Sequence, residues 1–167
     1  KTILAFSCPH LPFEHRDYLS FLKRIHVAYK CTDVVCLGDL IDNHSISYHE
    51  HDPDGFAPSH EMNEVDDRIY HWCKAFPQVF LCLGNHDKMA ARKSKTVGLP
   101  SRVFKPFREI WNLPKGWKDD FDWIIDGVKF IHGTGYSGNY AHVQAAYDNR
   151  MSTVIGHLHT IGGVEYL

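Results

Sequence analysis

Side chains that bind metal ions recur in this sequence at the points where short apolar runs end. The clearest case is CLGNHD, residues 82–87, where Asn85, His86 and Asp87 follow the apolar run at 79–81. These three residue types are poor strand formers, and burying polar groups without partners costs free energy. The cluster therefore indicates a functional site whose partners come from elsewhere in the chain.

Four further polar clusters follow apolar runs in the same way. They are Ser7-Cys8-Pro9-His10, Gly38-Asp39-Leu40-Ile41-Asp42, His132-Gly133 and Gly156-His157-Leu158-His159. Any one of them alone is more often a turn or a polar residue with ordinary partners. Because the carboxyl ends of parallel strands share one edge of a sheet, we expect all five clusters to meet there. Imidazole, carboxylate, amide and thiolate groups that converge in this way predict a transition-metal site.

The elements that must position these clusters alternate between strands and helices in the first half of the chain. Apolar runs predict strands at 2–6, 33–37 and 79–83, and apolar residues spaced three and four apart predict helices over 18–29 and 62–76. This order predicts an α/β fold with a parallel sheet and right-handed crossovers. Farther along we expect a short helix at 107–111, a hairpin of strands 121–125 and 128–131 around Asp126-Gly127, and strands at 152–155 and 163–167.

Length and composition are those of an ordinary globular domain. With 167 residues, 44% of them hydrophobic, we expect a single domain over 1–167. The net charge of -2 supplies no overall positive field that would recruit nucleic acid, although a local basic patch is compatible with it. No apolar run reaches the roughly 20 residues of a membrane span, so we expect no membrane partner. Five cysteines without regular spacing, and no visible secretory signal, predict reduced thiols and a cytoplasmic location.

The order of the five clusters resembles the calcineurin-like metallophosphoesterase superfamily. The matching blocks read CPH, GDLID, GNHD, IHG and GHLH, and they span residues 6–160. The sequence around these blocks also resembles phosphoesterases encoded by bacteriophages, which would place the protein in a host cytoplasm. The resemblance implies a β-sandwich of mixed sheets flanked by α-helices, with the metal site at the C-terminal ends of the strands. It implies metal-dependent hydrolysis of a phosphoester, with phosphodiesters slightly favoured over monoesters.

The same resemblance implies two divalent metal ions, of manganese, zinc, iron or nickel, and a bridging hydroxide. One ion would be held by Cys8, His10, Asp39 and His159. The other would be held by Asn85, His132 and His157, with Asp39 bridging the two. Two cations about 3.5–4 Å apart can hold a phosphate and activate water for in-line attack.

The resemblance also implies roles for the neighbours of these ligands. His86 would donate a proton to the leaving-group oxygen or clamp the phosphoryl group, and Asp87 would orient His86 and favour its imidazolium form. Asp42 would lie behind the ligands and support one of the histidines.

Cys8 stands where the superfamily has an aspartate. Its thiolate could be a ligand and favour zinc or iron over magnesium or manganese. Alternatively Cys8 is a small buried thiol, and His10, Asp39 and His159 alone hold the first ion, because three protein ligands suffice for a catalytic metal. A catalytically impaired metal-binding scaffold and a redox-sensitive metal-binding protein follow as alternative functions. The intact His86 weighs against the scaffold.

Two regions are candidates for contact with substrate. The irregular segment 42–60 is long for an ordered domain, which favours a functional loop over the metals, and its best candidate is His44. The alternative is a solvated loop packed by its own aromatic residues. Arg92, with Lys93 and Lys95, could contact a flanking phosphate of a nucleotide or nucleic acid, or form a solvated helix face. A nuclease of the same superfamily is therefore an alternative, against which the short chain and slightly acidic balance weigh. The oligomeric state is not predicted.

Overall fold

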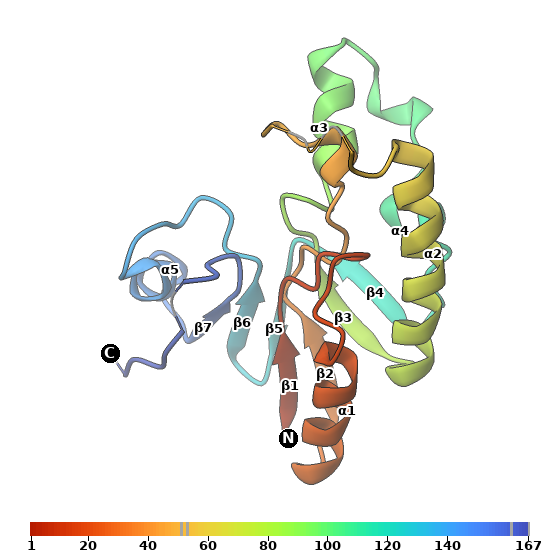
Figure 1. Ribbon diagram of the computed structural model, residues 1–167. Coiled ribbons are helices and arrows are strands. Elements are labelled where there is room, and N and C mark those ends of the chain that lie inside the picture. Colours follow the sequence, from red (N-terminus) through yellow and green to blue (C-terminus); the bar gives the residue numbers. More distant parts are fainter. Residues whose placement is uncertain (51, 53, 161, 167) are drawn as a thin grey trace.

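Figure 1 shows the computed structural model, which describes residues 1–50, 52, 54–160 and 162–166. The strands are β1 (Ile3–Phe6), β2 (Asp33–Cys36), β3 (Val79–Cys82), β4 (Trp117–Asp120), β5 (Asp122–Ile125), β6 (Val128–Ile131) and β7 (Thr153–Ile155). The α-helices are α1 (Tyr18–Ala28), α2 (Pro58–Ala75), α3 (Met89–Thr96), α4 (Phe107–Ile110) and α5 (Ala141–Asn149). Two short 3-10 helices are η1 (His44–Ile46) and η2 (Ser101–Val103).

The first sheet has the order β1-β2-β3-β4, and its neighbouring strands are all parallel. The predicted parallel arrangement of β1, β2 and β3 is therefore confirmed. β4 was not predicted, because WKDD carries a single apolar anchor. That anchor, Trp117, is fully buried, and its Nε1–H donates to the Phe76 carbonyl oxygen at 2.8 Å, which fixes the strand at the edge of the sheet.

The second sheet has the order β5-β6-β7. β5 and β6 pair antiparallel around Asp126 and Gly127, as the sequence predicts, and β7 pairs parallel to β6. Both turn residues have positive φ, 51° at Asp126 and 78° at Gly127, which suits the right-handed twist of a two-residue hairpin.

The predicted strand at 163–167 is wrong for its described part. Residues 162–166 form no strand, and Val164 and Tyr166 are 81% and 94% exposed. They have no strand partner among the described residues, and without a ladder an extended apolar segment gains little. Leu167 lies outside the described residues. The helix α5 was not predicted, because only Ala141 and Ala145 of its residues are buried and its apolar stripe is weak.

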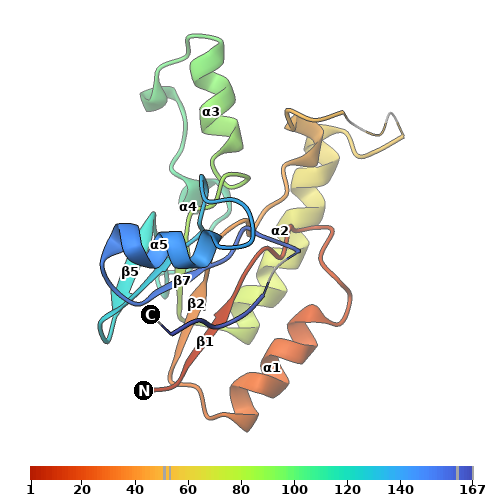
Figure 2. The ribbon, with the colours of Figure 1, turned by 90° about the vertical axis from the view of Figure 1, so that its left-hand side faces the viewer.

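Two apolar clusters hold these elements together. The larger lies between the first sheet and the helices and includes Leu22 from α1, Trp72 from α2 and Leu81 from β3. The smaller contains side chains from both sheets: Val35, Leu37, Cys82, Ile125 and Phe130. The first sheet is thus covered by α1 and α2 on one face and by the second sheet on the other, while α5 packs against β7 (Figures 1 and 2).

The sequence predicts reduced thiols and no membrane-spanning segment. All five cysteines are free, and Cys36 and Cys82 are fully buried core residues. Within the described part of the chain, no helix combines the length and apolar character that crossing a membrane requires.

Candidate metal centre

The loops that follow β1 and β2 continue the parallel pairing of those strands. The backbone N–H groups of Cys8 and His10 donate to the carbonyl oxygens of Gly38 and Asp39, both at 3.0 Å, and Leu11 N–H donates to Leu40 at 2.9 Å. This pairing sets the first polar cluster in register beside the second. The side chains of Cys8 and His10 are consequently brought next to the Asp39 carboxylate.

Close approach of the β2 and β3 loops depends on glycine. A Cβ atom at Gly84 would lie 2.1 Å from Asp39 Oδ1, which no side chain could tolerate. The Asp39 carboxylate occupies that space and accepts the backbone N–H of His86 at 2.8 Å. Gly84 therefore allows the second and third clusters to meet.

The backbone is left-handed at four candidate ligands. The φ angles of Cys8, His10, Asp39 and His157 are 53°, 54°, 50° and 69°. This conformation costs roughly 1–2 kcal/mol for a residue with a Cβ atom. Such residues concentrate at functional sites, where the surrounding structure over-determines them. The fold therefore holds these side chains in fixed directions at an energetic cost.

His132 lies at the centre of one half of the site, which we call the amide half (Asn85, His132 and His157). His132 is 3% exposed, and its Nδ1–H donates to the Leu37 carbonyl oxygen at 2.8 Å. In the neutral ring Nε2 then carries a lone pair. That atom lies 3.0 Å from both Asp39 Oδ2 and Asn85 Oδ1, and 3.1 Å from His157 Nδ1. Several lone pairs thus point at one another, an arrangement that a cation between them would satisfy.

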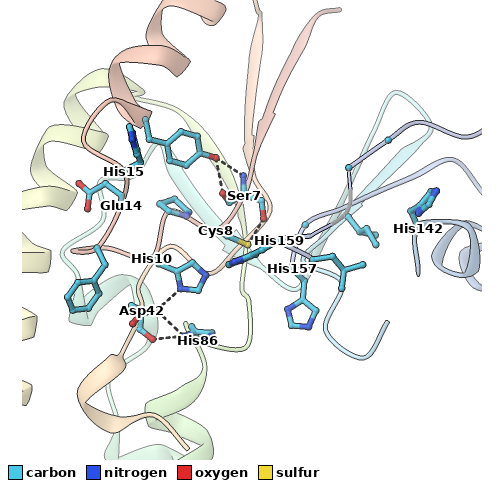
Figure 3. A pocket seen from close by; sticks show the side chains of 18 residues that line it. Ser7, Cys8, His10, Glu14, His15, Asp42, His86, His142, His157 and His159 are labelled. Atoms are coloured by element: carbon cyan, nitrogen blue, oxygen red, sulfur yellow. Dashed lines mark hydrogen bonds and ion pairs between the residues drawn. The ribbon is translucent and has the colours of Figure 1, made fainter. Parts of the chain in front are cut away.

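The other half of the site, which we call the thiol half, consists of Cys8, His10 and His159. Their ligand atoms lie within 4.8 Å of one another, and those of Cys8, Asp39 and His132 do so as well. His10 Nδ1 is 2.6 Å from Asp42 Oδ1, the supporting contact expected of Asp42. His10 Nε2 is buried and has no hydrogen-bond partner among the described residues. A metal at this point would give that nitrogen its missing partner, so the residues fit the group (Figure 3).

The charges of the site suit cation binding. Burial works to raise the pKa of Asp39, but the contact with His132 and other interactions lower it overall. Burial and the neighbouring histidines lower the pKa values of His157 and His159, which keeps both rings neutral and able to ligate. His10 differs, because burial lowers its pKa but the hydrogen bond to Asp42, the contact with Cys8 and nearby carboxylate charge outweigh burial and raise that pKa to about 10. A metal ion would have to displace the proton from His10 Nε2.

The position of Asp87 differs from the expectation that it orients His86. Asp87 is 7% exposed, and its two oxygens accept the backbone N–H groups of Ile41 and Gly84 at 3.1 and 2.8 Å. Both oxygens face the loops after β2 and β3 and satisfy buried N–H groups there. Burial and the Asp39 charge raise the pKa of Asp87 to about 6. Asp87 therefore links the two loops, and its side-chain hydrogen bonds go to Ile41 and Gly84 and not to the His86 ring.

The residue that orients His86 is Asp42. His86 Nδ1–H donates to the Asp42 carbonyl oxygen at 2.5 Å, and the Asp42 carboxylate lies 3.4 Å from the same nitrogen. Asn43 adds a hydrogen bond of 2.8 Å from Nδ2 to the His86 carbonyl oxygen. Asn43 was missed by sequence reasoning. Its signal is weak, an asparagine directly after the GDLID block, the residue type that tolerates the left-handed φ of 55° seen here.

A cavity of about 940 Å³ opens over the site and gives a substrate access to it (Figure 3). It is lined by Cys8, His10, Phe13, Asp42, His86, His157 and His159, among others. Asp39, Asn85 and His132 are not among the lining residues, and Asp39 and His132 are buried. The cavity therefore reaches both halves of the site, although its walls are mainly those of the thiol half.

The two substrate candidates lie outside the lining of this cavity. His44 Nδ1 is 3.8 Å from Asp42 Oδ2, and its ring packs edge-on against Phe13, so it borders the site. The Arg92 guanidinium instead lies 5.3 Å from the centre of the Tyr48 ring. In the segment 42–60, η1 and the start of α2 replace part of the expected irregular loop, and His51 lies outside the described residues.

The sequence matches the model of a known protein family. The family described as "Calcineurin-like phosphoesterase" matches residues 1–161, nearly the whole chain. No curated protein matches the sequence significantly.

Proposed function

Because the chain belongs to the calcineurin-like phosphoesterase family, and is thus a metal-dependent hydrolase of phosphoester bonds, we propose that it cleaves phosphodiesters at a dinuclear centre. The amide half and the thiol half would each hold one ion, and Asp39 would contact both. Manganese, zinc, iron and nickel all suit a donor set of imidazole, carboxylate and amide groups.

One observation carries this proposal. His132 Nε2, Asp39 Oδ2 and Asn85 Oδ1 lie within hydrogen-bond distance, yet none of them carries a proton when the His132 ring is neutral and donates through Nδ1. Such a cluster of lone pairs is unfavourable without a positive charge. The unpartnered Nε2 atom of His10 supports a second cation in the thiol half.

When bound, the ions would supply Lewis acidity that polarises the phosphoester and activates water. The protein's own groups keep the ligands in place. Asp42 accepts a hydrogen bond from His10 and so aims His10 Nε2 at the thiol half. The Leu37 carbonyl fixes the ring of His132 in the same manner. Contacts of this kind behind a ligand fix its tautomer and its orientation.

His86 is the residue that we expect to protonate the leaving group. Its Nδ1 is engaged by the Asp42 carbonyl oxygen, and its ring lines the cavity beside His10. The other nitrogen, Nε2, can donate a proton to a leaving oxygen when the ring is doubly protonated. General acid catalysis of this kind typically contributes about 10²–10⁴ in rate.

The first test is hydrolysis of bis-p-nitrophenyl phosphate and of p-nitrophenyl phosphate by chelator-stripped protein. Manganese, zinc, nickel and magnesium are added back one at a time, and metal content is measured after desalting. We expect turnover that requires metal and is faster with the diester than with the monoester.

Asn85→Ala is the matched control, because it removes a ligand of the amide half without introducing charge. We expect it to lose turnover while it retains the wild-type circular dichroism spectrum. Absence of turnover with every metal, or undiminished turnover in Asn85→Ala, would reject the proposal for this site.

A further inference from the structure

Two neighbouring segments that begin at the candidate metal centre carry opposite charge. The segment 42–67, which follows β2, has eight acidic residues and no Lys or Arg: Asp42, Glu50, Asp52, Asp54, Glu61, Glu64, Asp66 and Asp67. The segment 88–108, which follows β3, has seven basic residues and no Asp or Glu: Lys88, Arg92, Lys93, Lys95, Arg102, Lys105 and Arg108. We call them the acidic segment and the basic segment. The net charge of -2 hides this separation.

The basic segment begins directly after the Asn85-His86-Asp87 cluster. It comprises α3, η2 and the start of α4, and α3 stands clear of both sheets (Figures 1 and 2). The side chains of Arg92, Lys95, Arg102 and Lys105 are all exposed. Their charges therefore remain available to a partner in solution.

Contacts near Tyr48 join the basic segment to the acidic segment. The cationic groups of Arg92 and Lys93 lie 5.3 and 4.7 Å from the centre of the Tyr48 ring. Lys93 Nζ also donates to the Ser47 carbonyl oxygen at 2.9 Å. Cation–π contacts of this kind stabilise a fixed arrangement. The basic segment is thereby held beside the loop that begins at the metal centre.

We propose that the basic segment binds the phosphate backbone of a nucleic acid strand and directs one of its phosphodiesters to the metal centre. This inference rests on the proposed phosphodiesterase function, since a segment rich in cations that begins at such a centre matches a substrate with many phosphates. Contacts from Lys and Arg to phosphates position a nucleic acid without reading its sequence. The acidic side chains of the neighbouring segment would repel the strand and so orient it.

Salt dependence gives this inference a quantitative signature. A protein that neutralises phosphates releases bound counterions, and each contact contributes about 0.7 to the slope of log K against log salt for a single strand. Removing three contacts should therefore reduce the slope by about 2. A stacking or purely apolar interaction would leave the slope nearly unchanged.

The experiment uses fluorescence anisotropy of a labelled single-stranded DNA, a duplex DNA and an RNA with the metal-free protein. The test variant combines Lys95→Ala, Arg102→Ala and Lys105→Ala. The matched control combines Lys23→Ala, Arg24→Ala and Lys30→Ala, which removes the same charge from exposed positions on and after α1. We expect the test variant to bind at least one probe about tenfold more weakly or worse, with the lower salt slope, and the control to bind like wild type.

Several outcomes would overturn the inference. They are wild-type protein that binds none of the probes, a test variant with unchanged affinity and slope, and equal losses in both variants. Binding to vesicles of phosphatidylglycerol but to no oligonucleotide would assign the basic segment to a membrane instead. Because the binding assay needs no turnover, its result is independent of the hydrolysis test. Oligonucleotide binding without hydrolysis of bis-p-nitrophenyl phosphate would reject the proposed function alone.

Discussion

The two halves of the metal centre share Asp39 but are built differently. In the amide half, the Leu37 carbonyl fixes the ring of His132. Its Nε2 atom lies 3.0 Å from Asn85 Oδ1 and 3.1 Å from His157 Nδ1. In the thiol half, a carboxylate fixes His10, and Cys8 contributes a thiol. The amide half therefore offers nearly neutral ligands around one buried ring. The thiol half offers a soft ligand at the wall of the open cavity.

This difference has a chemical consequence. Neutral nitrogen and amide ligands leave a bound cation strongly electrophilic, whereas a thiolate would donate charge and favour zinc or iron. We therefore expect the two halves to respond unequally to substitution and to the choice of metal. A change at a residue shared by both halves should impair both, whereas a change behind one ligand should weaken only its own half.

The largest effect is expected from Asp39→Ala. Asp39 Oδ2 lies 3.0 Å from His132 Nε2 and 3.9 Å from His10 Nε2, so its loss removes a ligand from both halves. Loss of the several kcal/mol supplied by metal catalysis corresponds to about 10³-fold or more in kcat. Metal analysis should show the content of both ions reduced. Retention of full metal content and activity would contradict a shared ligand.

A large but substrate-dependent effect is expected from His86→Ala. Removal of a general acid should lower kcat by about 10²–10⁴ for a substrate with an alkyl leaving group. The loss should be much smaller for p-nitrophenyl esters, because p-nitrophenolate leaves without protonation. The measurement compares bis-p-nitrophenyl phosphate with methyl p-nitrophenyl phosphate and a dinucleotide. Equal losses with all three substrates would point to a phosphate clamp instead of a proton donor.

A one-sided effect is expected from Asp42→Asn. This change weakens the 2.6 Å contact that aims His10 at the thiol half, and it leaves the contacts of His132 intact. Loss of such a supporting group typically costs about 10–100-fold in metal affinity. Metal titration should therefore show one weakened site and one unchanged site. Weakening of both sites together would mean that the halves are not independent.

Cys8→Asp tests the thiol half alone, because it replaces the thiol with the aspartate that the sequence resemblance implies at this position. If the thiolate is a ligand, the substitution should shift the preferred metal from zinc or iron toward manganese or magnesium. We expect kcat with manganese to rise by about tenfold, the effect of roughly 1.4 kcal/mol. An unchanged order of metal preference would show that Cys8 does not ligate. Cys8→Ser serves as the control for size.

Much of this site could be predicted because its polar clusters follow apolar strands. The strands at β1, β2 and β3 were readable from runs of apolar residues, and parallel pairing carried Cys8, His10 and Asp39 to one edge. The hairpin at Asp126-Gly127 was readable from its turn chemistry. In each case a local pattern and the three-dimensional structure agree.

The misses have a different physical origin. Asp87 and Asp42 are both carboxylates close to His86, and only the paths of the β2 and β3 loops decide which one contacts it. Adjacency in the sequence favoured Asp87 as the residue that orients His86. In the structure, the buried N–H groups of Ile41 and Gly84 donate to both oxygens of Asp87. The edge strand β4 and the helix α5 were missed because tertiary contacts stabilise them. One such contact is the hydrogen bond from Trp117 to the Phe76 carbonyl, which no periodic pattern in the sequence indicates.

The smallest expected effect concerns the loop that carries Cys8. Tyr18 Oη donates to the Ser7 carbonyl oxygen at 2.8 Å, and burial raises the pKa of Tyr18 to about 12. The free phenol titrates near 10, so the folded state keeps its proton to higher pH. Stability from this group is complete below about pH 10 and is lost as pH rises toward 12. Tyr18→Phe should cost about 1 kcal/mol at neutral pH, the typical value of one hydrogen bond, and should flatten the alkaline fall of Tm. Parallel Tm curves for both proteins between neutral and alkaline pH would contradict the raised pKa of Tyr18, and equal Tm values at neutral pH would exclude its hydrogen bond as a support of this loop.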